Sequence, residues 1–299
     1  MPFRPRTFRI PASARRLRHL ALLLLLLASG AILAGRVLGP GETDIASELT
    51  GVTDASLEPP AELPLADRPI ARATSGEGGC AVRAEAVPQH AAMIALTVAA
   101  PCHAGNRVDI VQGELGVTVR LDAEGHAALS LPALSGSPTL AVRVAEAEPV
   151  QLLTWVSDFD RYQRAVLQWG GRPGLQLHAF ENGSGWGGAG HVGPDAPRAV
   201  ADAIAGTGGF LVRLGDAEVS DGLGALVYTA PAAVPVALTL EAPVTAETCG
   251  RHIDAAAFRV GPGLAPAPQP VALTVPGCQA VGDAVLIDGL LDARVAAVR

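Results

Sequence analysis

The feature that most constrains the fold is an alternation of apolar and polar residues with a period of two, which runs through the chain from Cys80 onward. Successive side chains of a β-strand point to opposite faces, so this period predicts strands that bury one face. Turn-forming sequences rich in Gly, Pro, Asp and Asn separate the alternating stretches. The clearest examples are residues 93–98, 115–121 and 140–144. The sequence therefore predicts an all-β protein built from antiparallel sheets.

The predicted strands fall into two domains. Residues 80–149 fit a small β-sandwich of the immunoglobulin or prealbumin kind, and residues 119–134 resemble the strand, Asp/Gly turn and strand of prealbumin-like and carboxypeptidase-regulatory modules. Residues 150–299 predict a second antiparallel β domain with one short helix, which begins after Asp195 and ends at Gly206. Its predicted strands lie at residues 150–156, 164–169, 174–181, 210–214, 225–229, 236–241, 271–275 and 284–287.

The N-terminal region has the pattern of an export signal. Residues 1–19 are rich in arginine and hold no acid, and residues 20–38 are apolar apart from Arg36. The length of this apolar segment lies between that of the apolar core of a signal peptide and that of a full transmembrane helix. We favour a transmembrane anchor over a cleaved signal peptide. The positive-inside rule then places residues 1–19 in the cytoplasm and the body in the periplasm, with the anchor in the inner membrane. Residues 39–79 are rich in Pro and acids and predict a disordered linker.

Charge excludes several classes of function. The 299-residue chain holds 29 acidic and 22 basic residues, and seven of the basic ones lie within the first 36 residues, so the body is strongly acidic. Attraction to phosphate dominates nucleic-acid binding, so we expect no nucleic-acid partner. The sequence contains no lysine, which excludes a Walker-type phosphate loop and Schiff-base chemistry. We expect no cofactor.

Four cysteines behind an export signal predict two structural disulfides. Neighbouring positions favour the pairs Cys80 with Cys102 and Cys249 with Cys278. A metal site built on cysteine is the alternative, but no Cys-x-x-Cys motif is present.

Side chains able to bind a ligand are most concentrated between residues 158 and 191. Alternation along residues 174–181 places Gln176 and His178 on one face, and a hairpin through residues 170–173 would bring Gln168 beside Gln176. These residues predict a binding cluster composed of Gln168, Trp169, Gln176, His178, Glu181, Trp186 and His191.

Two metal sites are alternatives to a plain binding cluster. His178, Glu181 and His191 could hold a catalytic zinc, since two imidazoles and a carboxylate with an open position suit that ion. Against this, residues three apart on a strand point to opposite faces, and no His-Glu-x-x-His motif is present. Asp158 and Asp160 could bind calcium, although Asp-x-Asp before an arginine is more typical of a salt-bridged turn.

Short stretches spread over the body carry a resemblance to a known family. They are residues 99–102, 166–169, 177–179, 181, 190–192, 244–245, 249–250, 276–278 and 281–283. In these the chain resembles membrane-anchored envelope proteins of alphaproteobacteria, a family of unknown function often loosely labelled translocases. It departs from that family at Asn182 and Gly193, where larger apolar or aromatic residues are usual. The resemblance implies no transport mechanism, because one span cannot form a pore.

Together these observations predict a non-catalytic module for binding or scaffolding, tethered to the inner membrane by residues 20–38. Its partner is expected to be an envelope protein or a glycan. The first alternative is a metal-assisted envelope hydrolase that uses His178, Glu181 and His191. The second is a glycan- or peptidoglycan-binding module, in which Trp169 and Trp186 would stack on sugar rings.

Overall fold

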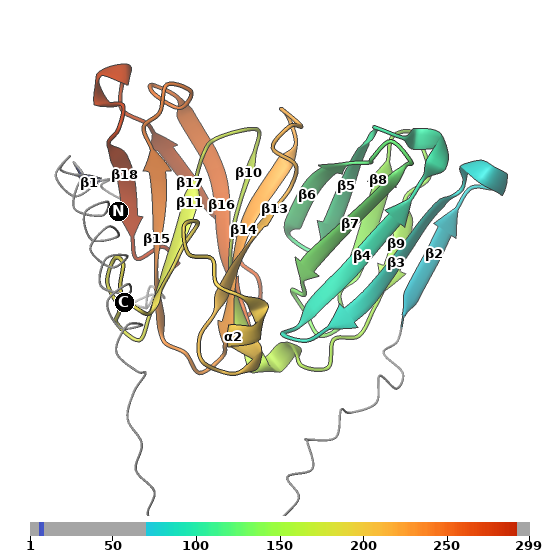
Figure 1. The fold of residues 1–299 in the computed structure, drawn as a ribbon, viewed down its shortest axis with the longest axis horizontal. Coiled ribbons are helices and arrows are strands. Elements are labelled where there is room, and N and C mark those ends of the chain that lie inside the picture. The colour runs from blue at the N-terminus through green and yellow to red at the C-terminus, as the bar shows by residue number, and fades with distance from the viewer. Residues whose placement is uncertain (1–5, 9–69, 292–299) are drawn as a thin grey trace, which may run out of the picture. The chain divides into compact units, whose positions relative to one another are not determined.

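The computed structural model describes residues 6–8 and 70–291, which fold mostly as strands in antiparallel sheets (Figure 1). The predicted anchor at residues 20–38 and most of the predicted linker lie outside these residues. Within the described part of the chain, no helix is long and apolar enough to cross a membrane.

The first sandwich consists of two four-stranded sheets. Its strands are β2 (Ala71–Ser75), β3 (Val82–Gln89), β4 (Met93–Ala99), β5 (Arg107–Gln112), β6 (Leu115–Arg120), β7 (His126–Pro132), β8 (Thr139–Val144) and β9 (Val150–Leu153). Sheet I has the order β2-β3-β4-β7, and sheet II has the order β6-β5-β8-β9. The alternating positions predicted to face inward, such as Leu96 and Val142, are fully buried between the two sheets.

The second sandwich consists of two five-stranded sheets. Its strands are β10 (Tyr162–Gly170), β11 (Gln176–Glu181), β12 (His191–Val192), β13 (Phe210–Leu214), β14 (Leu223–Pro231), β15 (Val236–Pro243), β16 (His252–Val260), β17 (Gln269–Thr274) and β18 (Ala284–Asp288), together with β1 (Arg6–Phe8). Sheet III has the order β13-β14-β10-β16-β17, and sheet IV has the order β1-β18-β15-β11-β12. The second hydrophobic core lies between them.

The first sandwich extends beyond both of its predicted ends. β2 pairs with β3 inside the predicted linker, because Ala71 and Ala73 pack against the core. β9 pairs with β8, so the strand assigned by sequence to the second domain belongs to sheet II. The boundary between the sandwiches therefore falls after Leu153 rather than at residue 150.

The hairpin predicted to join β10 and β11 is wrong. β10 pairs with β14 and β16 in sheet III, whereas β11 pairs with β15 and β12 in sheet IV. The chain therefore changes sheets at residues 171–175, and Gln168 does not lie beside Gln176. Pairing with more distant strands lets the apolar face of each strand contribute to the core between the sheets.

The central strand β10 of sheet III is buried on both faces along most of its length. Leu167 and Trp169 pack into the core between sheets III and IV. Tyr162 and Val166, from the opposite face of β10, belong to the core of the first sandwich. The side chain of Gln168 also points to the first sandwich, where it donates to the backbone oxygen of Glu114 at 2.7 Å.

Arg164 is the largest fully buried side chain on that face. Its Nη2 donates to the backbone oxygen of Ala92 at 3.2 Å, and its guanidinium lies 5.1 Å from the ring centroid of Phe159. Burial lowers the pKa of Arg164 to about 10. The carboxylate of Asp158, which was considered with Asp160 for calcium, accepts the N–H of Ala92 at 3.2 Å.

Both predicted disulfides are present, Cys80 with Cys102 and Cys249 with Cys278. The predicted helix is also present as α2 (Val200–Ile204). Its N-terminal N–H, from Ala199, is accepted by the carboxylate of Asp202 at 3.1 Å, so the cap differs from the predicted Asp195.

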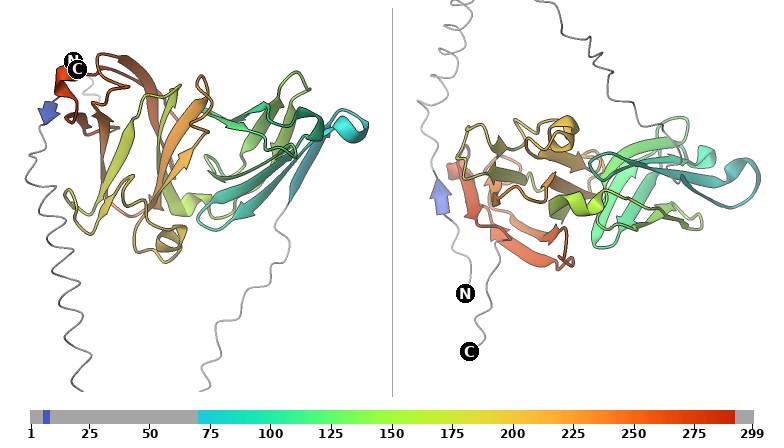
Figure 2. Two further views of the ribbon diagram at one scale, coloured as in Figure 1. Left: turned by 45° about the horizontal axis from the view of Figure 1, so that its top comes forward. Right: turned by 90° about the horizontal axis from the view of Figure 1, so that it is seen from below.

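The N-terminal strand β1 lies along β18, with Thr7 opposite Val285 (Figure 2). The other residues of the segment 1–19, for which a cytoplasmic location is predicted, lie outside the described residues.

Candidate functional site

The alternation of side chains along β11 builds the candidate site. Leu177 and Ala179 point into the second core, together with Glu181 at the end of the strand. His178 and Phe180 point to the outer face of sheet IV, yet each is less than a tenth exposed. These two rings lie on the outer face of sheet IV and are nevertheless buried, because the loop after β11 folds back over that face.

That loop, residues 182–199, completes an aromatic cluster on the outer face. β12 places His191 opposite Phe180, and the two rings stack with centroids 4.8 Å apart and an interplanar angle of 13°. The Trp186 ring lies 4.5 Å from His178, 5.1 Å from Phe180 and 5.1 Å from His191. Trp186 nevertheless remains 53% exposed. We call Trp186, His191, His178 and Phe180 the aromatic platform.

Hydrogen bonds fix the tautomers of both histidines. The backbone N–H of Gly187 donates to Nδ1 of His191 at 3.1 Å, so the proton of the neutral His191 ring sits on Nε2. His191 Nε2 lies 3.0 Å from Nδ1 of His178 and donates to it. The proton of His178 is therefore on its own Nε2.

Glu241 of β15 supplies the negative charge beside this pair. Its Oε2 lies 2.9 Å from Nε2 of His178, in an electrostatic contact that is not aligned as a hydrogen bond. Burial and the neighbouring His178 lower the pKa of His191, while Asp195 and Glu241 oppose that shift.

Gly193 makes the close packing of the histidines possible. A Cβ atom at this position would lie 2.7 Å from His178 Nδ1 and 3.3 Å from His191 Nε2. The first distance is shorter than carbon and nitrogen tolerate, so any side chain at position 193 would displace the His178 ring.

A second polar cluster lies on the inner side of β11. The Glu181 carboxylate is 2% exposed and accepts from Tyr228 at 2.8 Å and from the backbone N–H of Gly209 at 2.6 Å. Its other oxygen pairs with Arg198 at 2.9 Å. Arg198 also donates to the backbone oxygen of Ala189. Arg198 thereby ties the platform loop to the core.

This environment explains the titration of Tyr228. Burial raises the pKa of Tyr228, and the hydrogen bond to Glu181 raises it further. Tyr228 therefore remains a donor at physiological pH, and its hydrogen bond stabilises the buried carboxylate of Glu181.

The structure divides the predicted binding cluster among four places. His178, Trp186 and His191 meet in the platform, and Gln176 lies on the same face of β11 as His178. Glu181 lies on the inner face. The two remaining members lie in sheet III: Trp169 packs into the second core, and Gln168 contacts the first sandwich.

The predicted zinc site does not fit this geometry. Glu181 is committed to Arg198 and Tyr228 on the opposite face from the histidines. His191 would ligate through Nε2, which would move its proton to Nδ1, where the N–H of Gly187 already points. Within residues 6–8 and 70–291, no three His, Cys, Asp or Glu side chains gather as a metal site.

Sequence reasoning missed the partners contributed by other elements. Glu241 and Tyr228 come from β15 and β14, more than 40 residues along the chain. Partners so distant along the chain cannot be predicted from a local sequence pattern. Phe180 could have been predicted from the sequence. Alternation along the strand places it on the same face as His178, and aromatic rings commonly pack against histidines.

No protein-family model matches the sequence, and a search of curated proteins finds no significant match. Function must therefore be inferred from the geometry of the site.

Proposed function

We propose that this protein is a non-catalytic binding module of the extracytoplasmic space, and that its ligand is an envelope glycan stacked on Trp186. The observation that carries the proposal is that the Trp186 side chain is exposed and yet held in place by its neighbours. Trp186 is 53% exposed, while three neighbouring rings within about 5 Å hold its inner side. An exposed indole that is already fixed loses little conformational entropy when a ligand stacks on it.

The surroundings of Trp186 favour a glycan over a protein surface. Trp186 is the only large exposed apolar side chain of the platform loop, residues 182–199. Protein interfaces of stable complexes bury about 800 Å² on each partner, around an apolar centre. A single indole beside His178, which itself contacts the carboxylate of Glu241, fits one sugar ring, whose apolar face stacks while its hydroxyls form hydrogen bonds.

The histidines support binding rather than catalysis. Both nitrogens of His191 and Nδ1 of His178 are used in hydrogen bonds within the pair and its loop. A general base needs a free lone pair directed at the substrate. The pair instead forms a rigid support beside Trp186.

The two disulfides indicate an oxidising, extracytoplasmic compartment. We place the body in the periplasm and the anchor of the inner membrane at residues 20–38, in line with the resemblance to anchored envelope proteins.

The test is co-sedimentation of the full-length protein in detergent with purified peptidoglycan. Trp186→Ala removes the stacking surface and should weaken binding at least tenfold. Trp155→Ala is the matched control, because Trp155 is 58% exposed and follows β9 of the first sandwich, outside the platform loop. Unchanged binding by Trp186→Ala, or equal loss in both variants, would overturn the proposal.

A scaffolding role with a protein partner is the second candidate. Leu153 and Trp155 are 67% and 58% exposed and point to the same side of the segment that continues β9. Tryptophan is among the side chains that most often anchor a protein interface. Crosslinking at position 153 would trap that partner, whereas a glycan ligand would leave the same position uncrosslinked.

A further inference from the structure

A cleft of about 540 Å³ opens at one end of the second sandwich. Four segments surround it: the turn between β10 and β11, the end of β13, the start of β14, and the loop after β15. Its size is in the range of sites that enclose a small ligand. Trp169, Pro173 and Leu223 give it apolar walls.

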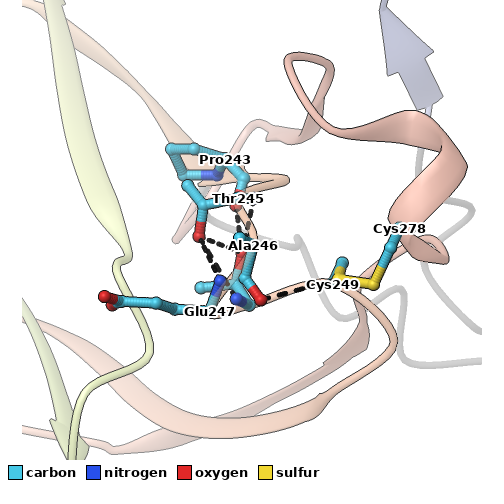
Figure 3. Close-up of a disulfide and its surroundings, with 7 residues drawn as sticks. Pro243, Thr245, Ala246, Glu247, Cys249 and Cys278 are labelled. Atoms are coloured by element: carbon cyan, nitrogen blue, oxygen red, sulfur yellow. Dashed lines mark hydrogen bonds between the residues drawn. A yellow bond between two sulfur atoms is a disulfide. The ribbon is translucent and has the colours of Figure 1, made fainter.

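The loop after β15 is fixed before any ligand arrives. The hydroxyl of Thr245 accepts the N–H groups of Glu247 and Thr248, each at 3.2 Å. The disulfide between Cys249 and Cys278 holds the end of the loop, and Figure 3 shows the side chain of Glu247 directed away from it. A wall that is already ordered costs little entropy on binding.

Glycines shape the opposite wall. Gly215 has a φ of 97°, a conformation that other residues rarely adopt. A Cβ atom at Gly224 would lie 3.0 Å from Nε1 of Trp169. Side chains at these positions would narrow the cleft beside the indole.

The polar groups of the cleft have two kinds of chemistry. Arg172 and Arg213 are exposed and form no ion pair with any residue that the structure describes, and Arg213 Cζ lies 6.0 Å from the ring centroid of Trp169. Asp216 and Glu247 contribute carboxylates. Gln176 contributes an amide with no hydrogen bond inside the described ranges.

We propose that this cleft binds a saccharide that carries a carboxylate. Arginine pairs with carboxylates through two parallel hydrogen bonds, so Arg172 and Arg213 can hold the charged group. Carboxylate and amide oxygens of Asp216, Glu247 and Gln176 accept from hydroxyl groups. The cleft acids would repel a simple anion such as phosphate, whereas a hydroxylated ring gives them donors to bind. The cleft does not depend on the platform or on Trp186.

The test uses full-length protein in deuterated detergent and saturation-transfer NMR with three probes: glucuronate, glucose and inorganic phosphate as competitor. Glucuronate and glucose differ at the oxidised carbon, so their comparison isolates the carboxylate. Glucuronate should bind at least tenfold more tightly than glucose. Arg172→Gln and Arg213→Gln should each weaken it at least fivefold.

Two control variants show whether the loss of binding is specific to the cleft. Arg143→Gln removes the same charge from an exposed position of β8 and should leave glucuronate binding unchanged. Trp186→Ala should also leave it unchanged, so a failed platform and a failed cleft give different results. Equal binding of glucose, displacement of glucuronate by equimolar phosphate, or loss of binding in Arg143→Gln would overturn the proposal.

Discussion

Removing the positive charge of Arg198 is expected to destabilise the protein by about 3 kcal/mol. The Glu181 carboxylate is 2% exposed, and Arg198 Nη1 at 2.9 Å is its only cationic contact in the described part of the chain. Breaking a buried pair by deleting one partner costs roughly 3 to 5 kcal/mol, because the remaining charge stays buried. The side chain of Arg198 is 21% exposed, so water already weakens the pair and the lower end of that range applies.

The assay is urea unfolding of full-length Arg198→Gln, followed by tryptophan fluorescence. Glu181→Gln in the same background removes the stranded charge, so the double variant should be more stable than Arg198→Gln alone. Tyr228→Phe removes one hydrogen bond to a charged acceptor and should cost about 1.5 to 3 kcal/mol. Arg143→Gln, an exposed arginine, should change stability by less than about 0.5 kcal/mol.

A loss below about 1 kcal/mol in Arg198→Gln would be incompatible with a buried Glu181 carboxylate that depends on this arginine. So would strict additivity of the Glu181→Gln and Arg198→Gln effects, because two coupled charges cannot contribute independently.

Three further predictions concern the loops and the platform. Replacing Cys249 and Cys278 by serine releases a loop closed over a separation of 29 residues and should cost about 3.6 kcal/mol in urea unfolding, whereas a loss below about 1 kcal/mol would contradict this value. Because the pKa of His191 is lowered in the folded protein, the unfolded chain binds more protons, so stability should fall as pH drops through 6.5. Unfolding at pH 7.5 and 5.5 measures this, and His191→Gln should show a smaller drop. Gly193→Ala should force the two histidine rings apart at a cost of roughly 1 to 3 kcal/mol, and unchanged imidazole NMR signals would disprove the packing.

Local pattern predicted the strands well where apolar and polar residues contrast. The stretch at 210–214 coincides with β13, and the predicted strand at 236–241 lies within β15. β16 escaped detection because Ala255, Ala256 and Ala257 blur the contrast between its faces. Alanine fits either face of a strand and is also a strong helix former, so its runs carry little information about period.

The local sequence pattern could not predict which strands pair with each other. The turn at residues 170–173 has the composition of a hairpin, yet β10 and β11 enter different sheets. Glycine and proline permit a chain reversal and equally permit a crossing between sheets. The buried apolar length of β10 decides the outcome, since a strand covered on both faces needs partners on both edges.

The candidate site was predictable only where its residues lie close together in the sequence. His178, Trp186 and His191 lie within 14 residues, and they meet through one loop and one short strand. Glu181 was correctly expected on the opposite face from His178, since they are three residues apart on one strand. Its partners Arg198 and Tyr228 required the three-dimensional fold.

Calorimetric titration of a soluble N-acetylglucosamine tetramer into the full-length protein, Trp186→Ala and Trp155→Ala would show whether the platform binds a glycan. If Trp186 is the stacking surface, its replacement should raise Kd at least tenfold, equivalent to about 1.4 kcal/mol. Trp155→Ala should leave Kd unchanged. An absence of binding to the wild-type protein, or the same Kd for wild type and Trp186→Ala, would contradict a glycan-binding role for the platform.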